Sequence, residues 1–167
     1  MIFRIRFQIV ASTLLLLCGL APAFAASAVT TINVTVARFL TVTNTSTLEF
    51  GTVSVSSTAG AVTVGIDSMR YAVGGVTVNP AEHFTPAIFL IEGKPYENFV
   101  VKLPTKVELR DNHGNTIEVN QFKSTVDSGA LDANGLLEIK IGGQIDLDAN
   151  QSSGDYSGTM VVELNYS

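Results

Sequence analysis

The chain has 167 residues, of which 46% are hydrophobic, and it carries 10 basic and 15 acidic side chains for a formal charge of −5. Nucleic acids and anionic lipid surfaces bind proteins through cationic faces, so this balance excludes both as expected partners. The length is typical of one domain whose core is large enough to fold unaided.

The first 25 residues have the features of an export signal. Residues 1–25 combine a basic start at Arg4 and Arg6, the apolar run "IVASTLLLLCGLA" and the small-residue exit "APAFA". This is the pattern of a secretory signal peptide, and the apolar run is shorter than a bilayer span requires. We expect cleavage after Ala25, export of the chain, and no direct membrane insertion of residues 26–167.

The distribution of cysteine agrees with export but provides no disulfide bond. The one cysteine, Cys18, lies in the apolar run after Leu17, which is larger than the small residue that lipoprotein processing requires. A lipid anchor is therefore not expected. Residues 26–167 contain no cysteine, so we predict a fold stabilised by packing and not by disulfides. Their formal charge is −7, with eight basic and fifteen acidic side chains.

Residues 26–38, "ASAVTTINVTVAR", form an N-terminal extension with the period of a β-strand. Arg38 ends its apolar row, just before the domain predicted for residues 39–167. The side chains that share one face of this segment are Ala28, Thr30, Ile32, Val34 and Val36.

The rest of the chain alternates apolar and polar residues almost throughout and is rich in Val, Thr, Ile and Phe, which favour strands. Turn signals separate the segments at roughly ten-residue spacing: "STAG", "GG" at 74–75, "EGKP", "DNHGN", "DANG" and "GG" at 142–143. We predict an all-β fold, a single antiparallel β-sandwich. The expected strands cover residues 31–42, 48–56, 60–66, 74–79, 86–93, 98–104, 106–111, 115–122, 136–143, 144–149 and 156–166.

The last predicted strand stays patterned to the penultimate residue of the chain. Terminal residues usually fray, so we expect this strand to be held by a partner, either within the chain or from another molecule. Its one-sided row consists of Tyr156, Met160, Val162, Leu164 and Tyr166.

Candidate catalytic and metal-binding residues are few. His83 and His113 are the two histidines, and the exported chain has no cysteine or nucleophile motif to accompany them, so we do not expect an enzyme or a cofactor. Asp146, Asp148 and Asn150 have the opening spacing of a calcium loop. The positions that an EF-hand gives to glycine and to a bidentate glutamate are here Gln and Ser, so we predict no metal site.

A family resemblance covers most of the exported chain. The motifs "FGT" at 50–52, "GGV" at 74–76, "LDANG" at 131–135 and "ANQSSGDYSGT" at 149–159 occur in the order found in the bacterial domain-of-unknown-function family 4402. From Leu48 to Tyr166 the chain resembles that family, whose name assigns no activity.

The C-terminus also resembles the subunits of chaperone–usher pili. Such pilins carry a glycine fourteenth from the C-terminus, alternating apolar residues and a penultimate tyrosine, and here the matching residues are Gly154, Met160, Val162, Leu164 and Tyr166. The resemblance implies an immunoglobulin-like sandwich that lacks a strand and is completed by donor-strand exchange. The implied donor residues are Ala28, Thr30, Ile32, Val34 and Val36.

The same resemblance implies a function. We expect a fimbrial structural subunit that passes through the periplasm to an extracellular fibre, involved in cell adhesion or biofilm. Its partners would be neighbouring copies or related subunits, a periplasmic chaperone and an outer-membrane usher. The alternative is a secreted adhesion or binding module whose sandwich is complete within its own chain. Alternation does not separate these two, because strands within and between chains share one period.

Overall fold

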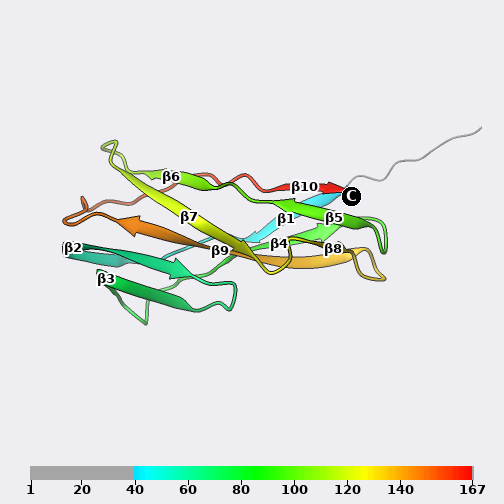
Figure 1. Cartoon of the computed structure of the whole chain (residues 1–167), viewed down its shortest axis with the longest axis horizontal. Helices are drawn as coiled ribbons and strands as arrows, with labels where there is room; N and C mark the ends of the chain where they lie inside the picture. The colour runs from blue at the N-terminus through cyan, green and yellow to red at the C-terminus, as the bar shows by residue number, and fades with distance from the viewer. Residues whose placement is uncertain (1–39, 167) are drawn as a thin grey trace, which may run out of the picture. The chain divides into compact units, whose positions relative to one another are not determined.

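A computed structural model describes residues 40–166, which contain ten β-strands and no helix (Figure 1). By its contacts the chain divides into two units, and every described residue belongs to the second, Val36–Ser167. No segment within residues 40–166 is a helix long and apolar enough to cross a membrane. The all-β antiparallel sandwich predicted from the sequence is confirmed.

The larger sheet is organised around one long strand, β9 (Leu136–Leu147). Residues 136–141 of β9 pair with β4, and residues 144–146 pair with both β2 and β7, so the second half of β9 lies between those two strands. The remaining strands of this sheet are β1 (Thr41–Ser46), β2 (Val53–Val64), β3 (Arg70–Val78), β4 (Ala87–Glu92), β6 (Lys106–Arg110) and β7 (Thr116–Ser124).

The smaller sheet has the order β10-β5-β8. Its central strand β5 (Asn98–Lys102) pairs with β8 (Ser128–Ala130) on one side and with β10 (Glu163–Tyr166) on the other. The predicted C-terminal strand of residues 156–166 was therefore too long, since only its last four residues belong to the ladder. The preceding residues follow β6, where Ser157 forms an isolated bridge with Arg110.

The inward-facing apolar residues form two core clusters, one at each half of β9. In the first cluster, Phe99 of β5 packs against Ile91 of β4 and Ile139 of β9, which joins the two sheets. In the second, Val62 of β2 and Val119 of β7 meet at the other half of β9. Each such fully buried side chain contributes roughly 1.5–3 kcal/mol through the hydrophobic effect. The polar residues between them in sequence lie on the outer faces.

Three glycine-based turn predictions were wrong. The segments "STAG", "GG" at 74–75 and "GG" at 142–143 lie inside β2, β3 and β9 and do not reverse the chain. A Cβ on Gly75 would overlap the carbonyl oxygen of Thr58, and one on Gly142 would overlap that of Val64. β2 also carries a register shift between Val55 and Gly60. Glycine here permits close backbone approach and a bulge, which a sequence pattern does not distinguish from a turn.

Candidate functional site

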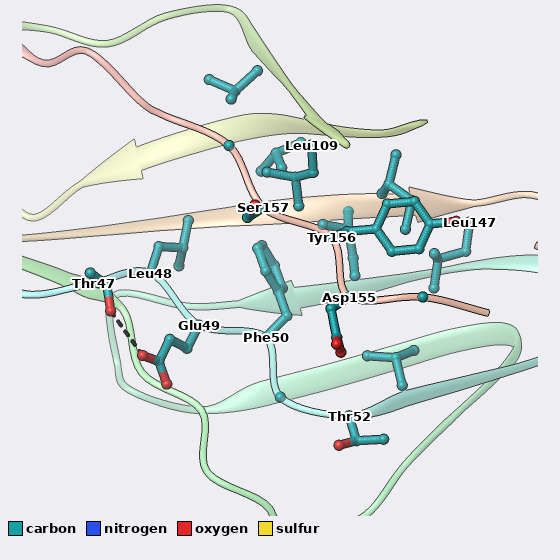
Figure 2. Close-up of a pocket in the computed structure, with 18 of the residues that line it drawn as sticks. Thr47, Leu48, Glu49, Phe50, Thr52, Leu109, Leu147, Asp155, Tyr156 and Ser157 are labelled. Carbon is teal, nitrogen blue, oxygen red and sulfur yellow. Dashed lines mark hydrogen bonds between the residues drawn. The ribbon is translucent and has the colours of Figure 1, made fainter. Parts of the chain in front are cut away.

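A groove of about 1160 Å³ opens between two segments that are far apart in the sequence. One wall is the segment Thr47–Val55, which follows β1 and includes the first three residues of β2, and the other is the segment Gln151–Met160, which precedes β10. Figure 2 shows these segments on opposite sides of the groove, with Phe50 on one and Tyr156 on the other. The site therefore lies between the first and last parts of the described chain.

The floor of the groove is the hydrophobic core itself. Side chains from β4, β6, β7 and β9 reach it, and most of them belong to one of the two core clusters. Five of these residues are buried and four are half-buried, so an occupant would contact the half-buried ones directly. The apolar floor residues are Ala87, Phe89, Val107, Leu109, Ile117, Val119, Phe122, Ile145 and Leu147.

The first wall presents an open backbone edge. The amide of Glu49 donates to the carbonyl of Thr85 at 2.9 Å, and the amide of Thr85 donates back to Glu49 at 3.0 Å. In extended backbone successive residues direct these groups to opposite sides. The N–H and C=O of Leu48 accordingly have no hydrogen-bond partner within residues 40–166, whereas the C=O of Phe50, two residues on, accepts from the Arg70 guanidinium at 2.8 Å.

The second wall repeats this arrangement. The amide of Arg110 donates to the carbonyl of Ser157 at 2.8 Å, and the amide of Ser157 donates to Arg110 at 3.0 Å. The backbone groups of Tyr156 and Gly158, on either side of Ser157, have no partner among the residues described. Two edges with free donors and acceptors thus border one apolar floor, which is the environment that accepts an added β-strand.

The structure gives a physical role to Gly154. A Cβ at this position would lie 2.9 Å from Oδ2 of Asp111. The Asp111 carboxylate accepts hydrogen bonds from the amides of His113 at 2.9 Å and Asn115 at 2.7 Å, and from Nδ2 of Asn115 at 2.7 Å. These bonds, foremost that of the Asn115 side chain, hold the pKa of Asp111 below its ordinary value. Gly154 therefore lets the last segment pass close to the turn "DNHGN".

The other predicted C-terminal residues lie along one side of the last segment. Met160, Val162 and Leu164 are half-buried and pack against the first core cluster. Tyr166 is 41% exposed, and its hydroxyl lies 3.1 Å from where a Cβ on Gly93 would be. Met160 is the one of these four that lines the groove.

The predicted donor residues Ala28, Thr30, Ile32, Val34 and Val36 lie outside the described residues. Conversely, the wall formed by Leu48 and Phe50 was not predicted as part of a site. Its sequence was interpreted as an ordinary strand, because the alternation of "LEFGTVSVS" is the same whether the edge is paired or open.

The candidate catalytic and calcium residues are not brought together. Nε2 of His83 lies 3.5 Å from Glu49, and Nδ1 of His113 lies 3.6 Å from Asp111. Asp146 accepts hydrogen bonds from the side chains of Gln144 and Asn120 on the outer sheet face. Within residues 40–166 no three His, Cys, Asp or Glu side chains are grouped so that they could hold a metal ion.

Fold and groove together define an antiparallel β-sandwich domain with an open apolar groove between its first and last segments. Residues 40–166 match the family described as a domain of unknown function (DUF4402), and the chain belongs to that family. Neither the curated proteins nor the solved structures gave a match.

Proposed function

We propose that this protein is a structural subunit of a bacterial surface fibre, exported to the periplasm and polymerised by donor-strand exchange. The observation that carries the proposal is the groove, in which two open backbone edges border an apolar core floor. A strand inserted there would supply the missing hydrogen bonds and place alternate side chains on the floor. Pilin complementation is a known example of this mode of binding.

The N-terminal segment has the composition that this groove would accept. Ile32, Val34 and Val36 alternate with small polar residues, so one face of an extended strand would be apolar. Full burial of these three side chains would contribute roughly 5–9 kcal/mol. This is an upper value, since an unbound segment already hides part of its surface. This burial contribution is similar in size to the entire free energy of unfolding of many domains.

Chain geometry favours insertion into a neighbouring copy. The chain enters β1 at Thr41, which pairs with Glu92, and apart from Asn44 the first wall of the groove lies beyond β1, from Thr47 onward. To fill its own groove, the N-terminal segment would have to reverse and run back beside β1. The residues at which it would reverse, "VARFL" at 36–40, include no Gly, Pro, Asn or Asp, the residues that tight turns favour. A neighbouring copy needs no such reversal.

In this proposal the last segment of the chain is also a contact for assembly factors. Met160, Val162 and Leu164 are half-buried, and β10 has one paired edge, to β5, within the described residues. A periplasmic chaperone would bind the open side until a neighbouring subunit replaces it, and an outer-membrane usher would carry the growing fibre to the cell surface.

The test compares residues 26–167 with the variants Val34→Asp and Thr35→Asp. Val34 belongs to the apolar row, whereas Thr35 has the opposite parity and serves as the matched control. We expect the unmodified chain and Thr35→Asp to form SDS-resistant multimers, and Val34→Asp to form none, as measured by gel electrophoresis and light scattering. A stable monomer that Val34→Asp leaves unchanged would contradict polymerisation and favour a self-contained binding module.

A further inference from the structure

The rim of the groove carries more acidic than basic side chains. Its lining includes the carboxylates of Glu49, Glu82 and Asp155, while the Arg70 guanidinium lies against the first wall and donates to the carbonyl of Phe50 at 2.8 Å. Glu49 accepts a hydrogen bond from the hydroxyl of Thr47 at 2.9 Å, and its carboxylate lies 3.5 Å from Nε2 of His83. The side chains of Glu82 and Asp155 belong to exposed residues and have no hydrogen bond or ion pair within residues 40–166. An occupant would therefore meet a negative potential beside the apolar floor.

The two terminal segments of the chain differ in charge although both alternate. Residues 26–38 contain one charged residue, Arg38, which has the same parity as Ile32, Val34 and Val36. Residues 156–166 contain one charged residue of opposite sign, Glu163. In each molecule residues 156–166 already form part of the groove wall and pair with β5, so they are not a free segment that could enter a neighbour. Like charges brought together at an interface disfavour a wrong partner, whereas opposite charges favour the correct one.

We propose that the carboxylates of the rim recognise Arg38 in the N-terminal segment of a second copy, and that Arg38 lies beside Asp155. This inference rests on the proposed function. With its apolar row placed alongside residues 156–166, the inserted strand runs antiparallel to them.

The binding test uses residues 26–167 with Val34→Asp as acceptor, so that its own segment does not compete. The probes are fluorescent, N-acetylated peptides of residues 26–39, unmodified or with Arg38→Lys, Arg38→Ala or Arg38→Glu. We expect Arg38→Lys to bind nearly as well as the unmodified peptide, Arg38→Ala about fivefold more weakly, and Arg38→Glu at least about tenfold more weakly at low salt. High salt should reduce these differences.

A matched acceptor identifies the source of the effect. Adding Glu49→Gln, Glu82→Gln and Asp155→Asn to the acceptor should remove the discrimination among the peptides. If the unmodified and Arg38→Glu peptides bind equally, the charge selection is wrong while the groove keeps its proposed role. If no peptide binds at all, the proposed function itself fails, and this inference fails with it.

Crosslinking in the otherwise unmodified chain tests the geometry without relying on a weakened acceptor. Residues 26–167 contain no cysteine, so introduced pairs report directly. We expect Arg38→Cys combined with Asp155→Cys to give disulfide-linked multimers, and Arg38→Cys combined with Glu163→Cys to give none. Crosslinking through position 163 in place of 155 would overturn the proposal, because it requires the opposite strand direction.

Discussion

The two core clusters share the strand β9 but differ in how they are covered. Around Ile139 the core is closed by Phe99 of the smaller sheet and by Leu131, which follows β8, and each is 1% exposed. Around Ile145 the core residues are also buried, but the groove borders them through the half-buried Val107 and Leu109. We call the first the closed region and the second the open region. We expect an occupant of the groove to stabilise the open region and not the closed one.

The largest expected effect comes from truncating a side chain in the closed region. Phe99→Ala should lower the free energy of unfolding by about 3–5 kcal/mol, because a buried aromatic leaves a large cavity. The matched change in the open region is Leu109→Ala, at a half-buried floor residue, with an expected loss of about 1–2 kcal/mol. Urea unfolding with and without the peptide of residues 26–39 measures both.

The peptide separates the two regions further. It should stabilise the Phe99→Ala variant as much as the unmodified chain, since Phe99 does not line the groove. It should stabilise Leu109→Ala less, because part of the floor has been removed. If the peptide stabilises both variants equally, it does not bind over Leu109, and the proposed difference between the two regions is wrong.

A smaller effect is expected from two glycines with positive φ, one in a turn of each region. Gly135 has φ +77, and a Cβ there would overlap the carbonyl oxygen of Gly93, whereas Gly114 has φ +86 and nothing within 4 Å. Gly114→Ala should cost about 1 kcal/mol from backbone strain alone. Gly135→Ala should cost more than about 2 kcal/mol, since strain and overlap combine. Thermal unfolding of both variants measures the two losses of stability. If only backbone strain mattered, the two losses would be equal.

The smallest expected effect is a loss of stability in acid through the aspartates of the same two turns. Hydrogen bonds hold the pKa of Asp111 and of Asp132 below the ordinary value near 3.8, foremost from the side chain of Asn115 and from the amide of Leu136. A lowered folded-state pKa stabilises the fold above the unfolded value, and this contribution is lost as the pH falls below about 4.

Substitutions at these turns should therefore flatten the dependence of the melting temperature on pH. Asp111→Asn should flatten it more than Asp132→Asn, because the Asp111 side chain is 1% exposed and Asp132 lies in an exposed turn. Asp148→Asn is the control, since no hydrogen bond to its carboxylate is found within residues 40–166. Melting curves between neutral pH and about pH 3 measure the slopes. An unchanged slope for Asp111→Asn would show that this turn opens before it titrates.

Much of the fold could be predicted from the sequence because strand period and turn chemistry are local. The turns at "EGKP", "DNHGN" and "DANG" are confirmed, and each is followed by a strand. The glycine pairs at 74–75 and 142–143 were predicted as turns and lie within strands. Their function is to admit a neighbouring backbone, and the identity of that neighbour depends on residues far away in the sequence.

The candidate site was predicted only in part for the same reason. Met160 and Gly154 were singled out by a short C-terminal resemblance, and both line the groove. The opposite wall at Leu48 and Phe50 has no local signal, because an open edge and a paired edge share one alternation.

The order of residues was enough to establish that this chain folds as strands, which side chains face inward, and that its two terminal segments carry opposite charge. Those properties follow from side-chain chemistry and a two-residue period. The folded structure was needed to show which strands are neighbours, and hence that the segments Thr47–Val55 and Gln151–Met160 border one groove with unpaired backbone groups. Strand pairing is a long-range property, since hydrogen bonds in a sheet join residues regardless of their separation along the chain.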